Sequence, residues 1–357
     1  MPPIGFLRFL SLSLLTVTFV LIANQDVGAA DKSGTIESGA ATIDGMDTFV
    51  IDNTNDGTTS SNLSFSAAGA RELTISSNGA DADDTANLGT INVGDNNDTS
   101  ELMVNDASNG DDLIVIVNGA VTGDVATDAN DLDIVLTATA NNDAGNTTLE
   151  FKSGVDIGAG TITLTGDADD TSILKFSGAS NQAIEGAIVS TTNDLGSKII
   201  IANGSNTASF STAIGANAGN GVESLVVEAG TRGSATFSST VNAKTVDIDT
   251  EAGASTMTFT GNVEGETWNI ETGGASGDTA AVNFGGNLNL TALNIDKETG
   301  ESTVTFNGGS AQTVVGNLTT TADGDGIVVI DNSNGVTFND DFGVAGNGVG
   351  SLQITSG

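Results

Sequence analysis

The chain has 357 residues, enough for two or three ordinary domains, but 47 of them are Gly and none is Cys, His or Tyr. Without His and Cys it cannot build Ser-His-Asp or Cys-His nucleophile systems, nor the usual zinc and iron sites. A formal net charge of −37 opposes binding to nucleic acids and to anionic membranes. No disulfide framework is available either, so stability has to come from packing.

Residues 1–30 predict a secretory signal peptide. Arg8 precedes an apolar run over residues 9–23, and the small residues of VGAA precede Asp31. The run is shorter than the ~20 apolar residues of a spanning helix, and no later stretch approaches that length. We therefore expect a mature chain that begins near Asp31, has no transmembrane segment and is secreted or held at a bacterial cell surface. A retained N-terminal anchor is the alternative.

Residues 31–146 form an acidic first part that is rich in Asp and Asn. Between residues 31 and 150, 22 acidic residues stand against only Lys32 and Arg71. Short apolar segments alternate there with turns such as DNTNDG and NDASNGDD, whose residue types favour tight turns. No window of the mature chain has apolar residues at helical spacing, so we predict strands and no helix.

Residues 147–357 repeat a strand that ends on Phe. Eight such strands occur at intervals of 22 to 34 residues, about 27 on average, and they end at Phe151, Phe176, Phe210, Phe237, Phe259, Phe284, Phe306 and Phe338. An apolar position that recurs with a period of 20–50 residues is typical of a stacked array. Units of this length are too short for a β-sandwich.

The repeat predicts an all-β fold, a parallel β-helix (β-solenoid) of about twelve irregular rungs. Each strand would pair with its equivalent in the next rung, about 4.8 Å away. The Phe side chains would form an internal ladder, and Trp268 would be a packed or a surface aromatic rather than a platform for a ligand. Thr, Ser and Asn would face solvent. We take TITLT (161–165) as the only unit with the T-x-T pattern of ice-binding solenoids, so this sequence does not predict ice binding.

Two longer segments repeat one another most closely. Residues 302–335 and 172–206 share a strand ending on Phe, the pattern F-x-G-x-x-x-Q, an apolar run and an Asn/Gly turn. The chain closes on SLQITSG, the counterpart of SLVVEAG at 224–230. We expect from this either that the sequence is a fragment of a longer polypeptide or that a partner supplies the next rung.

The acidic turns favour calcium as the one cofactor. Calcium takes six to eight oxygen ligands from carboxylates, amides and carbonyls on tight turns. DNTNDG resembles the start of an EF-hand loop, and TGDADDTS and ADGDG are further acidic turns. The candidate metal ligands are Asp52, Asp56, Asp167, Asp169, Asp323 and Asp325. Diffuse cation binding and purely solubilising turns are the alternatives. We assign no catalytic and no other cofactor-binding residue.

Units such as TVTFNG and AQTVVGNL after a signal peptide resemble the passenger regions of bacterial autotransporter adhesins. They are also similar to large rickettsial-type surface antigens and to S-layer-like β-strand-repeat proteins. The resemblance covers residues 147–357 clearly and 31–146 weakly. It implies a surface-exposed parallel β-helix that acts in adhesion or as a coat. Its partners would be cell-surface or extracellular glycans or proteins, or further copies that associate through the solenoid ends.

The leading hypothesis is therefore a non-enzymatic, exported surface protein in which an acidic β-solenoid forms a stalk, coat or adhesin. A β-helical carbohydrate-active enzyme is the first alternative. In it Asp167, Asp169 and Asp170 would form a hydrolase cluster, or Lys175 or Arg232 would serve a lyase as its base. A cation-dependent S-layer component is the second alternative.

Overall fold

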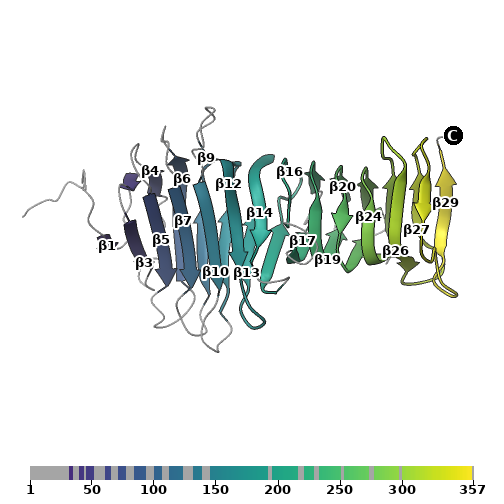
Figure 1. Cartoon of the computed structure of the whole chain (residues 1–357), viewed down its shortest axis with the longest axis horizontal. Coiled ribbons are helices and arrows are strands. Elements are labelled where there is room, and N and C mark those ends of the chain that lie inside the picture. Colours follow the sequence, from purple (N-terminus) through teal and green to yellow (C-terminus); the bar gives the residue numbers. More distant parts are fainter. Residues whose placement is uncertain are drawn as a thin grey trace, which may run out of the picture.

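A computed structural model shows a long array of β-strands that cross the molecule side by side, in chain order from one end to the other (Figure 1). It describes residues 32–34, 40–43, 46–51, 61–65, 71–77, 84–93, 100–106, 112–123, 132–138, 145–191, 195–215, 221–228, 233–250, 253–272, 277–296 and 300–355. The predicted signal peptide lies outside these residues. No helix in the described ranges is long and apolar enough to cross a membrane.

The strands form three stacks that run along the array. Stack 1 contains β1 (Lys32–Gly34), β3 (Met46–Ile51), β5 (Arg71–Ser77), β7 (Ser100–Asp106), β10 (Leu132–Ala138), β21 (Val263–Glu264) and β28 (Val336–Phe338). Stack 2 contains β8 (Leu113–Val117), β11 (Thr147–Phe151), β13 (Ser172–Phe176), β15 (Ser197–Ile201), β17 (Val222–Glu228) and β22 (Thr267–Thr272). Stack 3 contains β2 (Ala40–Ile43), β4 (Ser61–Phe65), β9 (Val121–Thr122), β16 (Thr207–Phe210), β18 (Ser234–Phe237), β20 (Ala254–Phe259), β23 (Thr279–Phe284), β25 (Glu301–Phe306), β27 (Asp325–Ile330) and β29 (Val349–Ile354).

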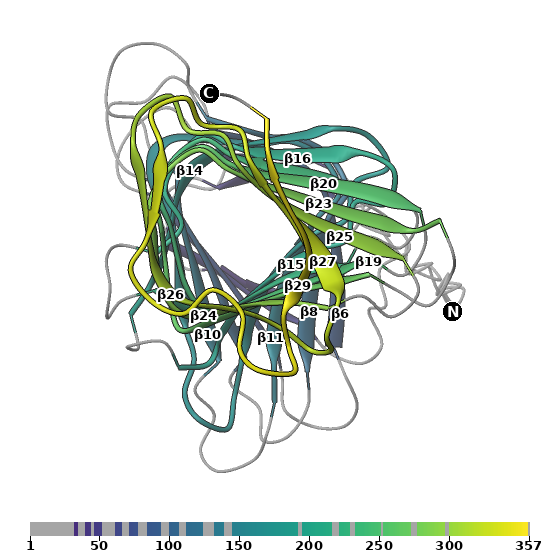
Figure 2. The ribbon, with the colours of Figure 1, turned by 90° about the vertical axis from the view of Figure 1, so that its right-hand side faces the viewer.

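Six longer strands turn a corner and contribute to two stacks. They are β6 (Asp84–Val93), β12 (Val155–Thr165), β14 (Gln182–Ser190), β19 (Val241–Thr250), β24 (Leu288–Ile295) and β26 (Gln312–Thr320). β12, for example, pairs with β9 through Val155 in stack 3 and with β10 through Ile162 in stack 1. Seen along the array, the chain winds around a closed outline (Figure 2). The two parts predicted from the sequence share these stacks, since β8 pairs directly with β11.

One column of paired residues in stack 3 shows how regular the winding is. It steps eleven times through parallel register pairs, each 22 to 34 residues further along the chain: Leu63, Ile91, Val121, Val155, Ile184, Phe210, Phe237, Phe259, Phe284, Phe306, Ile330 and Ile354. The predicted all-β parallel β-solenoid is therefore confirmed between residues 63 and 354. The step length also agrees with the repeat read from the sequence.

The alternation of buried and partly exposed residues within each strand shows where the core lies. In β7, β10 and β13 every second residue is buried, and the residues between them are partly exposed. Side chains of successive strand residues point to opposite faces, so one set fills the interior and the other meets water. The interior contains Leu, Ile, Val and Phe from all three stacks as one continuous hydrophobic cluster. The solenoid therefore has a filled core along its length.

The Phe ladder is confirmed, but it changes stack twice. Phe151 and Phe176 lie in stack 2, the five from Phe210 to Phe306 lie in stack 3, and Phe338 lies in stack 1. Within a stack the rings are near-parallel, with centroids 4.6 to 5.9 Å apart. At both changes of stack the rings meet edge to face, at interplanar angles of 88° and 90°. Both geometries are favourable for aromatic pairs, so the ladder continues across the interior.

Of the two positions expected for Trp268, packed or on the surface, the structure shows the packed one. Its side chain is fully buried, and its ring centroid lies 5.0 Å from that of Phe259 and 6.0 Å from that of Phe284. Its indole Nε1 donates a hydrogen bond of 3.4 Å to the Ala243 carbonyl of the preceding rung. A buried Trp needs such a partner for its N–H.

The F-x-G-x-x-x-Q pattern forms a corner that is held by a buried glutamine. The Gln182 amide oxygen accepts from Gly178 N at 2.9 Å, and its Nε2 donates to the carbonyls of Phe151 and Ser153 at 3.0 and 2.9 Å. Gln312 makes the same three bonds, to Gly308 N and to the carbonyls of Phe284 and Gly286, at 2.8 to 2.9 Å. Each glutamine thus joins its own corner to the rung below.

This corner requires a glycine for a steric reason. A Cβ at Gly308 would lie 2.5 Å from the Gly285 carbonyl oxygen and 2.7 Å from Cδ of Gln312. Only Gly allows the glutamine amide to approach the backbone so closely.

The two copies of this corner occupy different positions around the solenoid. Phe176 in stack 2 is followed by Gln182 in stack 3, whereas Phe306 in stack 3 is followed by Gln312 in stack 1. Phe176 is therefore the equivalent of Phe306 in its local sequence but not in its stack. The corner is a local unit that can join either pair of neighbouring stacks.

Candidate functional sites

The predicted ligands Asp167 and Asp169 lie together in the exposed turn before β13. The Asp167 carboxylate accepts hydrogen bonds of 2.9 and 3.0 Å from the backbone amides of Asp169 and Asp170, which is the local bonding of an Asx turn. Asp170 is 1% exposed, and its Oδ1 accepts from Gly145 N at 2.8 Å. The Asp167 carboxylate thus shapes this turn, and the Asp170 carboxylate anchors the turn to the rung below.

The other predicted ligands lie far from that turn. Asp323 lies in the turn before β27, many rungs away, and Asp325 is the first residue of that strand, where its Oδ2 accepts from Ala322 N at 3.0 Å. Asp52 and Asp56 lie outside the described residues. In the described part of the chain, no three acidic side chains lie close enough together to hold a metal ion. Calcium binding stays a prediction, which calorimetry with millimolar calcium tests.

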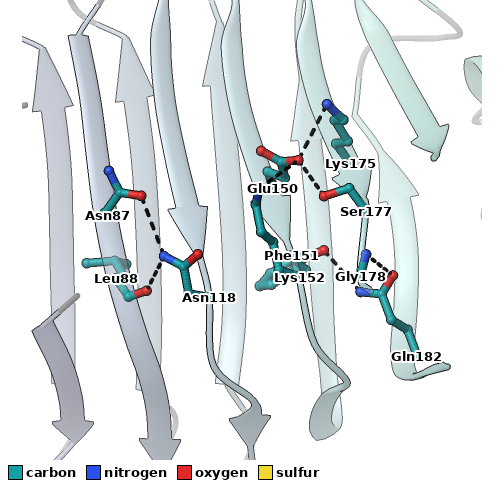
Figure 3. A network of polar contacts seen from close by, with 10 residues as sticks. All are labelled: Asn87, Leu88, Asn118, Glu150, Phe151, Lys152, Lys175, Ser177, Gly178 and Gln182. Atoms are coloured by element: carbon teal, nitrogen blue, oxygen red, sulfur yellow. Dashed lines mark hydrogen bonds and ion pairs between the residues drawn. The ribbon is translucent and has the colours of Figure 1, made fainter. Parts of the chain in front are cut away.

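Both ion pairs found among the described residues belong to one network on stack 2 (Figure 3). Glu150 Oε1 lies 3.4 Å from Lys175 Nζ and 3.8 Å from Lys152 Nζ, and it also accepts a hydrogen bond from the Ser177 hydroxyl. Glu150 and Lys175 are register neighbours on β11 and β13. Lys175, the base of the lyase alternative, therefore holds two rungs together. Arg232 lies outside the described residues.

Asn118 shows a second kind of link between rungs. Its Nδ2 donates to the Leu88 carbonyl at 3.1 Å and to Asn87 Oδ1 at 3.5 Å, one rung below (Figure 3). Asn294 repeats the contact with Asn269 at 2.9 Å. Such side-chain bonds satisfy polar groups along the outside of the stacked strands.

Three acidic residues form a column on the outside of stack 1. Glu72 is paired in register with Glu101, and Glu101 with Asp133. Partial burial raises the pKa of the Glu101 carboxyl above 4.5, and the carboxylates of Glu72 and Asp133 raise that pKa further. On stack 2, burial also raises the pKa of Asp247, against the opposing effect of Lys198. The surface thus contains carboxyls whose ionised form is disfavoured.

We expect Glu101→Gln to stabilise the protein at neutral pH. The Glu101 carboxyl has a higher pKa in the folded than in the unfolded state, so its protonation favours folding. This stabilisation is complete below about pH 4.5 and is lost as the pH rises through the folded-state pKa. At pH 7 the substitution should therefore raise the free energy of unfolding by about 0.5 kcal/mol, the size of a cross-strand like-charge repulsion. Urea unfolding at pH 3.5 and pH 7 measures the difference.

The control is Glu264→Gln, because Glu264 lies in the same stack and its register neighbours on both sides, Asn242 and Asn289, are neutral. It should leave the stability unchanged at both pH values. Equal gains for the two variants, or a gain for Glu101→Gln at pH 3.5 only, would contradict the repulsion.

Stack 3 presents a face that the sequence analysis missed. On β16, β18, β20, β23 and β25 the last two outward residues before the closing Phe are Thr207 and Ser209, Ser234 and Thr236, Thr256 and Thr258, Ala281 and Asn283, and Thr303 and Thr305. They form two columns in strict register. We call these ten residues the hydroxyl face. β20, β23 and β25 have one further outward residue each, at their first position: Ala254, Thr279 and Glu301. The expectation that TITLT is the only T-x-T unit is wrong, since TMT and TVT lie in this array.

TITLT itself is not part of such an array. It lies in stack 1, where Thr163 is paired with Val135 and Val189. The Thr161 hydroxyl is already bonded to Asp133 Oδ1 at 3.0 Å. A pattern within one strand did not reveal which residues lie beside it in the next rung.

Comparison with known proteins adds no family to this description. No family model matches the chain, and no curated protein or solved structure is significantly similar to it. What is established is the parallel β-solenoid fold itself.

Proposed function

We propose that the chain is a non-enzymatic, exported protein of a bacterial cell surface, in which an acidic β-solenoid acts as a rigid stalk, coat or adhesin. The observation that carries this proposal is the unbroken stack 3 column from Leu63 to Ile354. In a solenoid each rung contacts only its neighbours, so stacking produces an extended, stiff body with large lateral surfaces. The resemblance to autotransporter passengers supports the same reading.

Electron microscopy of negatively stained protein tests this proposal. Eleven steps of about 4.8 Å correspond to a rod of about 53 Å for residues 63–354. Isolated rods would favour a stalk or adhesin, and ordered lattices would favour a coat. Compact particles would contradict an extended structural role. Cleavage of any member of a panel of anionic polysaccharides, with or without calcium, would contradict the non-enzymatic role.

A cation-dependent coat is a second candidate, favoured by the column of Glu72, Glu101 and Asp133. Counterions relieve repulsion between such stacked carboxylates, and the net charge of −37 opposes the approach of two copies. Lattices that form with millimolar calcium and disperse with a chelator would support this candidate. Lattices that are insensitive to chelator would reject it.

We propose that copies of the chain associate with one another through the solenoid end. In β29, Leu352 and Ile354 are 52% and 73% exposed, although Val328, the register partner of Leu352, is fully buried. These side chains continue the interior columns, so a further parallel strand can pair with β29, whether it comes from a continuation of the chain or from another copy.

We expect Ile354→Lys to reduce association through this end, because a Lys on an edge strand opposes further pairing. Sedimentation of the full chain over a range of concentrations measures the effect. Gln353→Lys is the control, since Gln353 lies on the same strand and points outward. Identical sedimentation of the wild type and both variants would exclude this end as a contact.

A further inference from the structure

The hydroxyl face suggests a binding activity that the proposed structural role does not include. Its ten residues are Thr, Ser, Ala and Asn, and all of them are exposed or partly exposed. None is charged, although the chain has 46 acidic residues and the exposed Glu301 lies at the edge of the face, two positions before Thr303 on β25. Both columns continue without charge through Ile327 and Val329 on β27 and through Ser351 and Gln353 on β29. The outward positions of stack 2 differ, since they include Lys198, Asp247 and Glu271.

The face is regular in two directions. Along a strand, outward residues repeat every two positions, about 6.7 Å apart, and between rungs they repeat about every 4.8 Å. The pairings of β16, β18, β20, β23 and β25 show no register shift, whereas those of β12 with β14 and β24 with β26 do. These five strands therefore present a grid of side chains in unbroken register.

The core beneath the face keeps this grid rigid. The same five strands carry the Phe residues from Phe210 to Phe306, whose near-parallel rings are 4.6 to 5.9 Å apart. Thr is also stiff at χ1, so its hydroxyl and methyl groups hold fixed directions. The hydroxyls of the eight Thr and Ser residues form no hydrogen bond with the protein among the described contacts, whereas Thr161 of TITLT is bonded to Asp133. They are available to bond to water.

We propose that the hydroxyl face binds ice. The ordered water of an ice crystal presents oxygen atoms that repeat in two directions with spacings close to those of this grid. Binding such a surface requires many weak contacts made at once. A preorganised array makes these contacts with little loss of conformational entropy. Charged side chains would oppose it, because they hold liquid hydration shells that are costly to remove. Hydroxyls bond to the lattice, and methyl groups fill the spaces between its water molecules.

The test measures ice recrystallisation inhibition, thermal hysteresis and partition into a growing ice front, with the full chain as purified. Thr258→Lys places a long charged side chain at the centre of the face and should weaken inhibition about tenfold or more. Thr236→Lys is a second variant on the same face, in case one of them fails to fold. Circular dichroism and melting curves confirm that each variant keeps its structure.

The matched control is Thr267→Lys, an outward Thr of β22 in stack 2 that adds the same charge. It should keep the wild-type effect on ice. A wild type that affects ice no more than an unrelated acidic protein would overturn the proposal. So would equal losses in folded Thr258→Lys and Thr267→Lys. If the wild type is inactive on ice and Thr258→Lys separates associated copies, the face is a lateral contact between copies instead. Rods or lattices in micrographs test the structural role separately.

Discussion

Phe259→Ala should lower the free energy of unfolding by about 3–5 kcal/mol, the cost of removing a fully buried Phe. Phe259 has three aromatic neighbours, a number that Phe284 equals and no other Phe of the ladder exceeds. Its ring centroid lies 4.6 Å from that of Phe237, 5.4 Å from that of Phe284 and 5.0 Å from that of Trp268. The truncation leaves a cavity that the rigid strand pairing around β20 cannot close. Urea unfolding measures the loss.

Hydrogen exchange adds a readout that is specific to a solenoid. Because each rung contacts only its neighbours, the loss of protection should centre on β18, β20 and β23 and decrease towards β10. The control is Phe338→Ala, since Phe338 is partly exposed and lies near one end of the stack. Phe338→Ala should lower the free energy of unfolding clearly less than Phe259→Ala does. Equal costs for the two variants, or a uniform loss of protection along the chain, would contradict nearest-neighbour stabilisation.

Gln312→Ala should cost about 3 kcal/mol, because it leaves several buried polar groups without partners. Gly308 N loses its acceptor, and the carbonyls of Phe284 and Gly286 lose their donor. Asn332 Nδ2, which donates to Gln312 Oε1 at 2.8 Å, loses a partner in the rung above. Thermal and urea unfolding measure the effect.

The chain contains its own replicate and its own control for this experiment. Gln182 makes the same three bonds at another corner, so Gln182→Ala should cost nearly as much as Gln312→Ala. Gln353 is exposed on β29, and Gln353→Ala should have almost no effect. If the two buried variants are no more costly than Gln353→Ala, the corners are not held by these amides.

The sequence was sufficient for the fold class because a solenoid repeats its requirements locally. Alternation of apolar and polar residues determines which side of each strand faces inward, whatever the strand pairs with. The recurrence of Phe every 22 to 34 residues implied a stack, and the ring contacts confirm it. The F-x-G-x-x-x-Q corner was also visible as a pattern, because its glycine and glutamine interact across only four residues.

Only the tertiary structure decided which residues lie side by side in neighbouring rungs. Turns of different length separate the strands, so equal local patterns reach different stacks, as Phe176 and Phe306 do. The same uncertainty hid the hydroxyl face, where Thr256 and Thr303 are 47 residues apart in the chain but belong to one column. It also hid the column of Glu72, Glu101 and Asp133. Composition and periodicity determine the structure of a single rung. The register between rungs depends on the lengths of all the turns along the chain, and this register decides which side chains lie together on the surface.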